Sequence, residues 1–140
     1  MKRLLLIAAV ALGLSLLGKF LADAFLMRAV PLLGTFVTLE PVLNPGVAFG
    51  VRLPAGVQEF VILFALILVI ALARSSARTR VQSAGFGLII GGAAANLFDR
   101  VPDGVVTDFF QVGTFPVFNV ADSCITVGVC LLLWDAVRRR

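Results

Sequence analysis

The sequence predicts an all-α membrane protein, a four-transmembrane-helix bundle with a small extracytoplasmic β-platform after the first helix. Of the 140 residues, 60% are hydrophobic, and the mean hydropathy is +1.06. Only 14% are charged, compared with roughly 25% in an average soluble domain. The apolar residues form runs long enough to cross a bilayer, which takes about 20 residues of helix. Four such runs occupy most of the chain, so we expect one membrane-embedded domain over residues 1–140.

We expect the four spans at about residues 4–24, 57–73, 81–98 and 117–136, with outer loops at about 27–56 and 99–116. The first span has the basic start of a secretory signal, but three more spans follow, so we expect it to be retained. The second span is almost purely aliphatic and is expected to be scaffold. The third contains Gly87 and Gly91 four residues apart, followed by Gly92, a pattern that favours close helix packing.

The first outer loop is too apolar for a free linker. Residues 34–40 (GTFVTLE) show the β-branched alternation of a short strand. Pro41, Pro45 and Gly46 are expected to end that strand, because proline cannot donate a backbone hydrogen bond. Residues 47–53 (VAFGVRL) are predicted to form a second extended stretch.

The basic residues predict the orientation. Three clusters fall on one side of a four-span topology. They are Lys2 and Arg3; Arg74, Arg78 and Arg80; and Arg138, Arg139 and Arg140. By the positive-inside rule this side is the cytoplasm, so both termini lie inside. The net charge of +4 is therefore explained by topology, and we expect no nucleic-acid partner.

Histidine is absent, which excludes Ser-His and Cys-His nucleophile systems and His-containing zinc motifs. Asp122 lies inside the fourth predicted span, where an ionisable group costs at least ~2.5 kcal/mol and thus suggests a function. Asp108, in the preceding loop, is a candidate partner. Two close carboxylates share one proton, so one can activate water while the other protonates a carbonyl oxygen. Each could instead be structural, Asp108 as a cap and Asp122 as a buried hydrogen-bonding group.

Three blocks of residues resemble the signal peptidase II family of intramembrane aspartic peptidases. The first block is residues 44–49 (NPGVAF), and the last is residues 118–123 (FNVADS). The middle block runs from residues 91–100 (GGAAANLFDR) through residues 104–109 (GVVTDF). The blocks occur in the family's order, and the resemblance covers nearly the whole chain.

The resemblance implies that Asp108 and Asp122 form the catalytic dyad. It also implies supporting or substrate-binding roles for a further set of residues, which comprises Asn44, Gly46, Asn96, Asp99, Arg100, Asn119 and Ala121. Asn96, Asp99 and Arg100 are spaced for one helical face, and Asp99 with Arg100 could also be only a local ion pair.

The implied substrate is a prolipoprotein carrying a diacylglyceryl-cysteine, cleaved just before that cysteine. The resemblance implies a monomer among membrane lipids in the bacterial cytoplasmic (inner) membrane, with the site at the outer face. No metal or cofactor is expected.

The chain departs from the family at Ser15, where an aspartate usually stands four residues before the lysine that is Lys19 here. If that aspartate supports the arginine at position 100, Asp23 could substitute for it, or the site is looser.

Three other functions compete with this prediction. The first is a catalytically inactive family member that binds lipoprotein signal peptides or lipid. The second is a Ser-Lys peptidase built from Ser15 and Lys19. The third is a proton-coupled carrier or channel subunit that uses Asp122, which the absence of an internal repeat disfavours.

Overall fold

The computed structural model of the chain describes residues 1–46 and 56–139. Its helices are α1 (Lys2–Phe25), α2 (Val57–Ser76), α3 (Arg80–Arg100) and α4 (Val120–Arg138). All four are long and apolar enough to cross a membrane. The expected multi-pass helical architecture is therefore confirmed, with helix ends that differ from the expected spans by a few residues.

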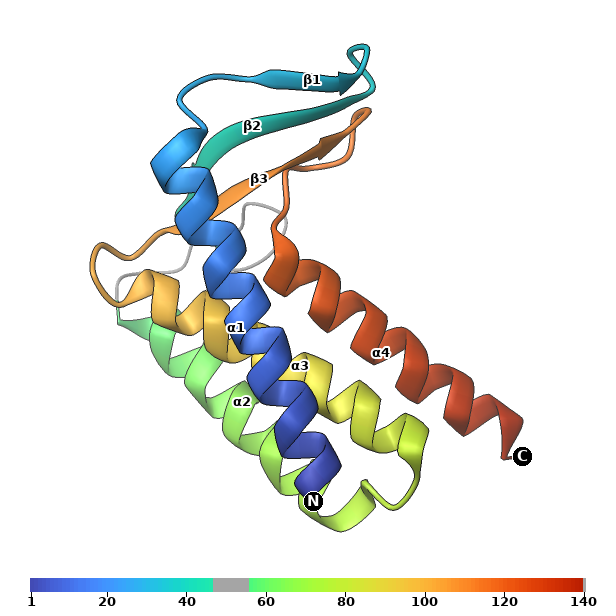
Figure 1. Cartoon of the computed structure of the whole chain (residues 1–140). Helices are drawn as coiled ribbons and strands as arrows, with labels where there is room; N and C mark the ends of the chain where they lie inside the picture. The colour runs from blue at the N-terminus through green and yellow to red at the C-terminus, as the bar shows by residue number, and fades with distance from the viewer. Residues whose placement is uncertain (47–55, 140) are drawn as a thin grey trace.

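Helix α3 is the centre of the bundle and packs against the other three helices (Figure 1). Its glycines make this possible on two faces. A Cβ on Gly87 would lie 2.9 Å from the backbone oxygen of Leu4 in α1, and one on Gly92 would lie 2.5 Å from the backbone oxygen of Ala121 in α4. Such distances leave no room for a side chain, so the predicted close packing of the third helix is confirmed.

Within the described residues, the β-platform is a three-stranded antiparallel sheet in the order β1-β2-β3. Strands β1 (Val30–Leu33) and β2 (Val37–Asn44) follow α1, whereas β3 (Val106–Val112) comes from the loop between α3 and α4. Figure 1 shows the sheet beyond one end of the bundle. The sequence prediction missed β3, because its residues were expected to form only a loop.

The prediction that Pro41 ends the strand is wrong. Strand β2 continues to Asn44, and its pairing with β3 shifts register between Leu39 and Val42. A bulge at this point accommodates a residue without a backbone N–H, so proline does not interrupt the strand. The extended stretch expected at residues 47–53 lies outside the described residues.

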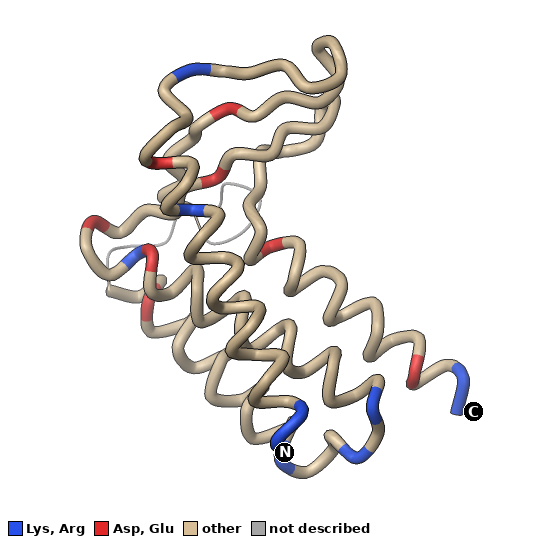
Figure 2. Tube along the Cα trace, viewed as in Figure 1, with Lys and Arg blue, Asp and Glu red and all other residues tan. Residues whose placement is uncertain are grey.

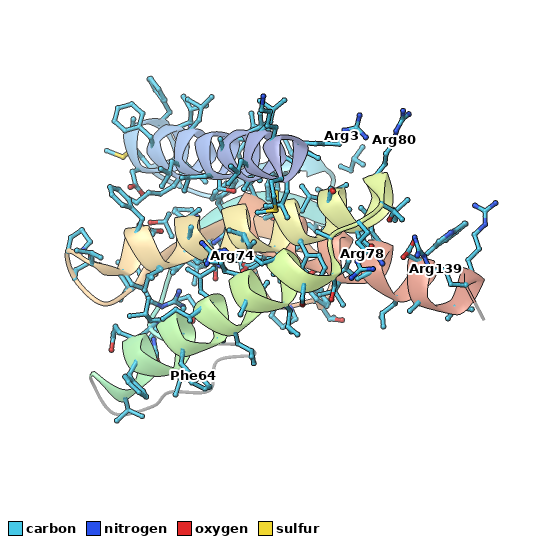
Figure 3. The ribbon with its side chains drawn as sticks, turned by 90° about the horizontal axis from the view of Figure 1, so that it is seen from below. Arg3, Phe64, Arg74, Arg78, Arg80 and Arg139 are labelled. Atoms are coloured by element: carbon cyan, nitrogen blue, oxygen red, sulfur yellow. The ribbon has the colours of Figure 1, made fainter. Side chains whose placement is uncertain are left out.

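The charges are separated along the bundle. The described basic clusters at the start of α1, around the α2–α3 turn and at the end of α4 lie at the end of the bundle away from the sheet (Figure 2). Arg3, Arg80 and Arg139 extend at this end when the bundle is turned (Figure 3). Most acidic residues lie toward the sheet end (Figure 2), and the grouping of the basic clusters at one end is the one expected from the sequence.

Candidate active site

Asp108 lies on β3 with only 2% of its surface exposed. Strand pairing places it opposite Val42, so Asn44 is its diagonal neighbour on the same face of the sheet. The Asn44 side-chain amide donates a 2.8 Å hydrogen bond to Asp108 Oδ2. Asn119 Nδ2 donates a 2.9 Å hydrogen bond to Asp108 Oδ1. Both carboxylate oxygens therefore accept from an asparagine.

Asp122 lies in the first turn of α4, where Asn119 is the N-cap residue. The backbone N–H of Asp122 donates to Asn119 Oδ1 at 2.9 Å, and that of Asn119 donates to Asp122 Oδ2 at 3.2 Å. This reciprocal capping box fixes both side chains at the start of the helix. Asn96 of α3 donates a 2.8 Å hydrogen bond to Asp122 Oδ1.

Asn119 joins the two aspartates. Its side-chain amide donates to Asp108 and also to Asn96 Oδ1 at 3.0 Å, while its backbone N–H donates to Asp122. The amide has only two N–H groups, and both are used. One residue thus sets the positions of both carboxylates relative to α3 and β3.

Both aspartates line a cavity of about 600 Å³. Its other polar lining residues are Asn44, Asn96, Arg100, Ser123 and Thr126. The apolar wall comes from the β3–α4 connection and the exposed side of α4 and includes Phe115, Val117, Phe118, Ile125 and Val127. The cavity therefore combines a carboxylate pair with an apolar surface that continues onto a membrane-spanning helix.

Burial raises the pKa of Asp108 from 3.8 to about 6. The hydrogen bonds from Asn44 and Asn119 favour the ionised carboxylate and oppose this change, as does the charge of Arg100. The negative charge of Asp122 acts in the same direction as burial. Asp108 therefore changes protonation close to neutral pH, which suits a group that exchanges protons during catalysis.

Arg100 connects the first outer loop to the cavity. Its guanidinium is buried and donates a 2.6 Å hydrogen bond to the backbone oxygen of Gly46. The backbone N–H of Gly46 donates to Asn44 Oδ1 at 2.8 Å, which orients the amide that reaches Asp108. Gly46 thus acts here on Arg100 and Asn44.

Asp99 and Arg100 were expected in a loop, but they lie in the last turn of α3 and point in different directions. Arg100 lines the cavity, whereas Asp99 forms an ion pair with Lys19 of α1 at 3.2 Å. Across residues 1–46 and 56–139 no ion pair joins Asp99 to Arg100, so that alternative is wrong. Ala121 is buried, and its backbone packs against Gly92.

The contacts around Ser15 support neither a Ser-Lys peptidase nor Asp23 as a substitute partner of Arg100. Ser15 Oγ donates to the backbone oxygen of Ala11 at 2.7 Å, and Lys19 is engaged by the carboxylates of Asp23 and Asp99. This arrangement disfavours a Ser-Lys peptidase. Asp23 pairs with Lys19 and not with Arg100, so it does not replace a partner of that arginine.

Thr107 was not among the predicted site residues, although it lies within the block of residues 104–109. Its side chain donates to Asp23 Oδ1 at 3.1 Å, and its backbone N–H donates to Asp99 Oδ2 at 2.8 Å. These contacts join residues that are 84 and 8 positions apart. No local pattern in the sequence could have found the first of them.

Comparison with known proteins decides the family. Residues 7–138 match the family model described as Signal peptidase (SPase) II. The chain belongs to the signal peptidase II family. It is therefore a peptidase and a multi-pass membrane protein. A single hydrogen-bonded network joins five of the predicted site residues: Asn44, Asn96, Asp108, Asn119 and Asp122.

Individual relatives agree with this assignment. The chain is similar to a lipoprotein signal peptidase of Rhodococcus jostii, with 43% identity covering 94% of this chain and 72% of the relative. A lipoprotein signal peptidase of Haemophilus influenzae is 40% identical over 94% of this chain and 84% of its own length. A solved bacterial membrane enzyme superimposes with a TM-score of 0.88 and 25% identity, covering 99% of this chain and 89% of that enzyme.

Proposed function

We propose that this protein removes signal peptides from prolipoproteins by aspartic peptidase chemistry, with Asp108 and Asp122 as the catalytic pair. The observation that carries the proposal is Asn119, which hydrogen-bonds to both carboxylates at the wall of one cavity. A structural hydrogen-bonding role for a single aspartate would not require the second one. The relatives' names, lipoprotein signal peptidase, supply the substrate class.

The chemistry follows from one proton shared by two carboxyl groups. The ionised carboxylate takes a proton from a water molecule, whose oxygen attacks the scissile carbonyl carbon. The protonated carboxyl donates to the carbonyl oxygen, and a proton then passes to the leaving nitrogen as the C–N bond breaks.

The cavity also fits a lipid-modified substrate. Its apolar wall on α4 continues to Val127, which is 51% exposed on a membrane-spanning helix. A diacylglyceryl chain attached to the cysteine beside the scissile bond would remain in the bilayer while the peptide bond reaches Asp108 and Asp122. We therefore propose a diacylglyceryl-cysteine substrate that is cleaved before the lipidated residue. We also propose that the active unit is a monomer, because every residue assigned to the dyad and its hydrogen bonds belongs to one chain and the chemistry requires no second copy.

The charge separation supports an orientation. With the basic end in the cytoplasm, the sheet and the dyad lie at the outer face of the cytoplasmic membrane (Figure 2). Both termini are then cytoplasmic.

The test uses the purified full chain in detergent micelles with a diacylglyceryl-modified prolipoprotein. Asp108→Asn and Asp122→Asn should each reduce kcat by at least ~100-fold, the lower range for general acid-base catalysis. Asp103→Asn is the matched control. Asp103 is an exposed acid in the connection between α3 and β3, so this variant should leave kcat unchanged. Retained cleavage in either dyad variant would refute the assignment. Binding without cleavage by the wild type would indicate an inactive family member.

A further inference from the structure

A second polar network lies on the other side of β3 from the cavity. Lys19 of α1 forms ion pairs with Asp23, one turn further along, and with Asp99 Oδ1 of α3. The other oxygen of Asp99 accepts the backbone N–H of Thr107, and Asp23 accepts the Thr107 hydroxyl. Thr107 and Asp99 are 5% and 8% exposed, so the hydrogen bond between them is shielded from solvent.

This network holds the residue next to the catalytic candidate. Successive side chains of a strand point to opposite faces, so Thr107 and Asp108 face opposite sides of β3. The cavities show the same alternation. Val106 and Asp108 line the large cavity that contains the dyad, whereas Thr107 lines a small cavity of about 10 Å³ against α1. Whatever fixes Thr107 therefore fixes the backbone from which Asp108 projects.

Thr107 is held at two points by two different helices. The carboxylate of Asp99 accepts from the Thr107 backbone N–H and that of Asp23 accepts from the Thr107 side chain, while Lys19 forms an ion pair with each of the two carboxylates. Ser15 lines the same small cavity but donates to Ala11, and no hydrogen bond within the described residues joins it to Lys19. On α1, the acid that completes the network is therefore Asp23.

We propose that Asp23 is a positioning residue for Asp108, acting through Thr107 and held by Lys19. This inference rests on the proposed dyad. Among the described residues that line the large cavity, neither Asp23 nor Thr107 occurs, so neither contacts a peptide bound there. Loss of either contact displaces Asp108 without removing a substrate contact. The rate of the chemical step then falls while substrate binding is retained.

The test combines Asp23→Ala, Thr107→Val and the double variant in the full chain, with the same lipid-modified substrate. Each single variant should lower kcat by roughly tenfold with unchanged KM. A displacement of ~1 Å can cost ~100-fold, and the displacement expected here is smaller because Asp99 still holds the backbone of Thr107. Both changes remove the same hydrogen bond between Asp23 and Thr107. The kcat of the double variant should therefore be no lower than that of the less active single variant. Glu40→Ala is the control, an acid on β2 for which the described part of the chain shows no side-chain hydrogen bond or ion pair.

Three results would overturn the positioning role. These are wild-type kcat in either single variant, a raised KM at unchanged kcat, and losses that multiply in the double variant. Thr107→Val keeps the β-branched shape, so it remains informative if Asp23→Ala does not fold. Failure of the dyad is distinguished by Asp108→Asn. If that variant still cleaves, the dyad is wrong; if it is inactive while Asp23→Ala keeps the wild-type kcat, only the positioning role is wrong.

Discussion

The protonation of Asp108 should make the stability of the protein depend on pH in a way that Asp108→Asn abolishes. Burial raises the pKa of Asp108 in the folded protein from 3.8 to about 6. Between these values the folded state binds more protons than the unfolded state, so the free energy of unfolding decreases as pH rises. At about 1.36 kcal/mol per pKa unit, and with part of the change already complete at pH 4, this group lowers the free energy of unfolding by about 2 kcal/mol between pH 4 and pH 7.

Asp108→Asn has a second, opposite effect that does not depend on pH. Asn44 and Asn119 both donate to Asp108, and their own oxygens are already engaged by backbone N–H groups. An asparagine at position 108 can accept only one of these hydrogen bonds and presents an NH₂ group to the other donor. This mismatch costs about 1–3 kcal/mol at every pH. The change in stability with pH therefore isolates the carboxyl group.

The assay is unfolding in detergent micelles, monitored for the wild type and Asp108→Asn at several values from about pH 4 to pH 7. The difference in unfolding free energy between the two proteins should change by about 2 kcal/mol over this range, in favour of the variant at the higher pH. Asp103→Asn should follow the wild type, because Asp103 is exposed. Parallel curves for the wild type and Asp108→Asn would refute the claim that burial dominates the ionisation of Asp108.

Two further variants test the site and the packing. Asn44→Ala removes a hydrogen bond that favours ionised Asp108, so the pKa of Asp108 rises further and the limb of the kcat–pH profile near pH 6 should move to higher pH; an unchanged or lower limb would contradict this. Gly92→Ala places a Cβ 2.5 Å from the backbone oxygen of Ala121, which should lower the free energy of unfolding by about 1–3 kcal/mol in a denaturation assay. Gly13→Ala, with nothing within 4 Å, is its control and should not destabilise the protein.

The membrane architecture was predictable because its signals are local. A helix in a bilayer satisfies its own backbone hydrogen bonds, so hydropathy over about 20 residues is sufficient to find it. The glycines of α3 and the three basic clusters are likewise visible in short windows. The dyad required more: the spacing of Asp108 and Asp122 left structural roles open for each, and the family resemblance selected them.

The sheet was only partly predictable. The alternation in residues 34–40 indicated one strand, and Pro41 wrongly suggested its end. Strand β3 forms because the chain returns after α3 to pair with β2, a contact between segments more than 60 residues apart. Strand pairing depends on such distant partners, so a single segment does not reveal its role in a sheet.

By itself, the sequence determined the four apolar helices, the separation of charge between their ends and the residues that carry the family resemblance. Only the tertiary structure decided that Asn119 joins the two aspartates, that Asp99 turns to Lys19 and not to Arg100, and that Asp23 reaches Thr107. Hydropathy and helix packing depend on residue types within one segment. Hydrogen bonds between α1, α3, β3 and α4 depend on where the folded chain places their ends, and that is set by all of these segments together.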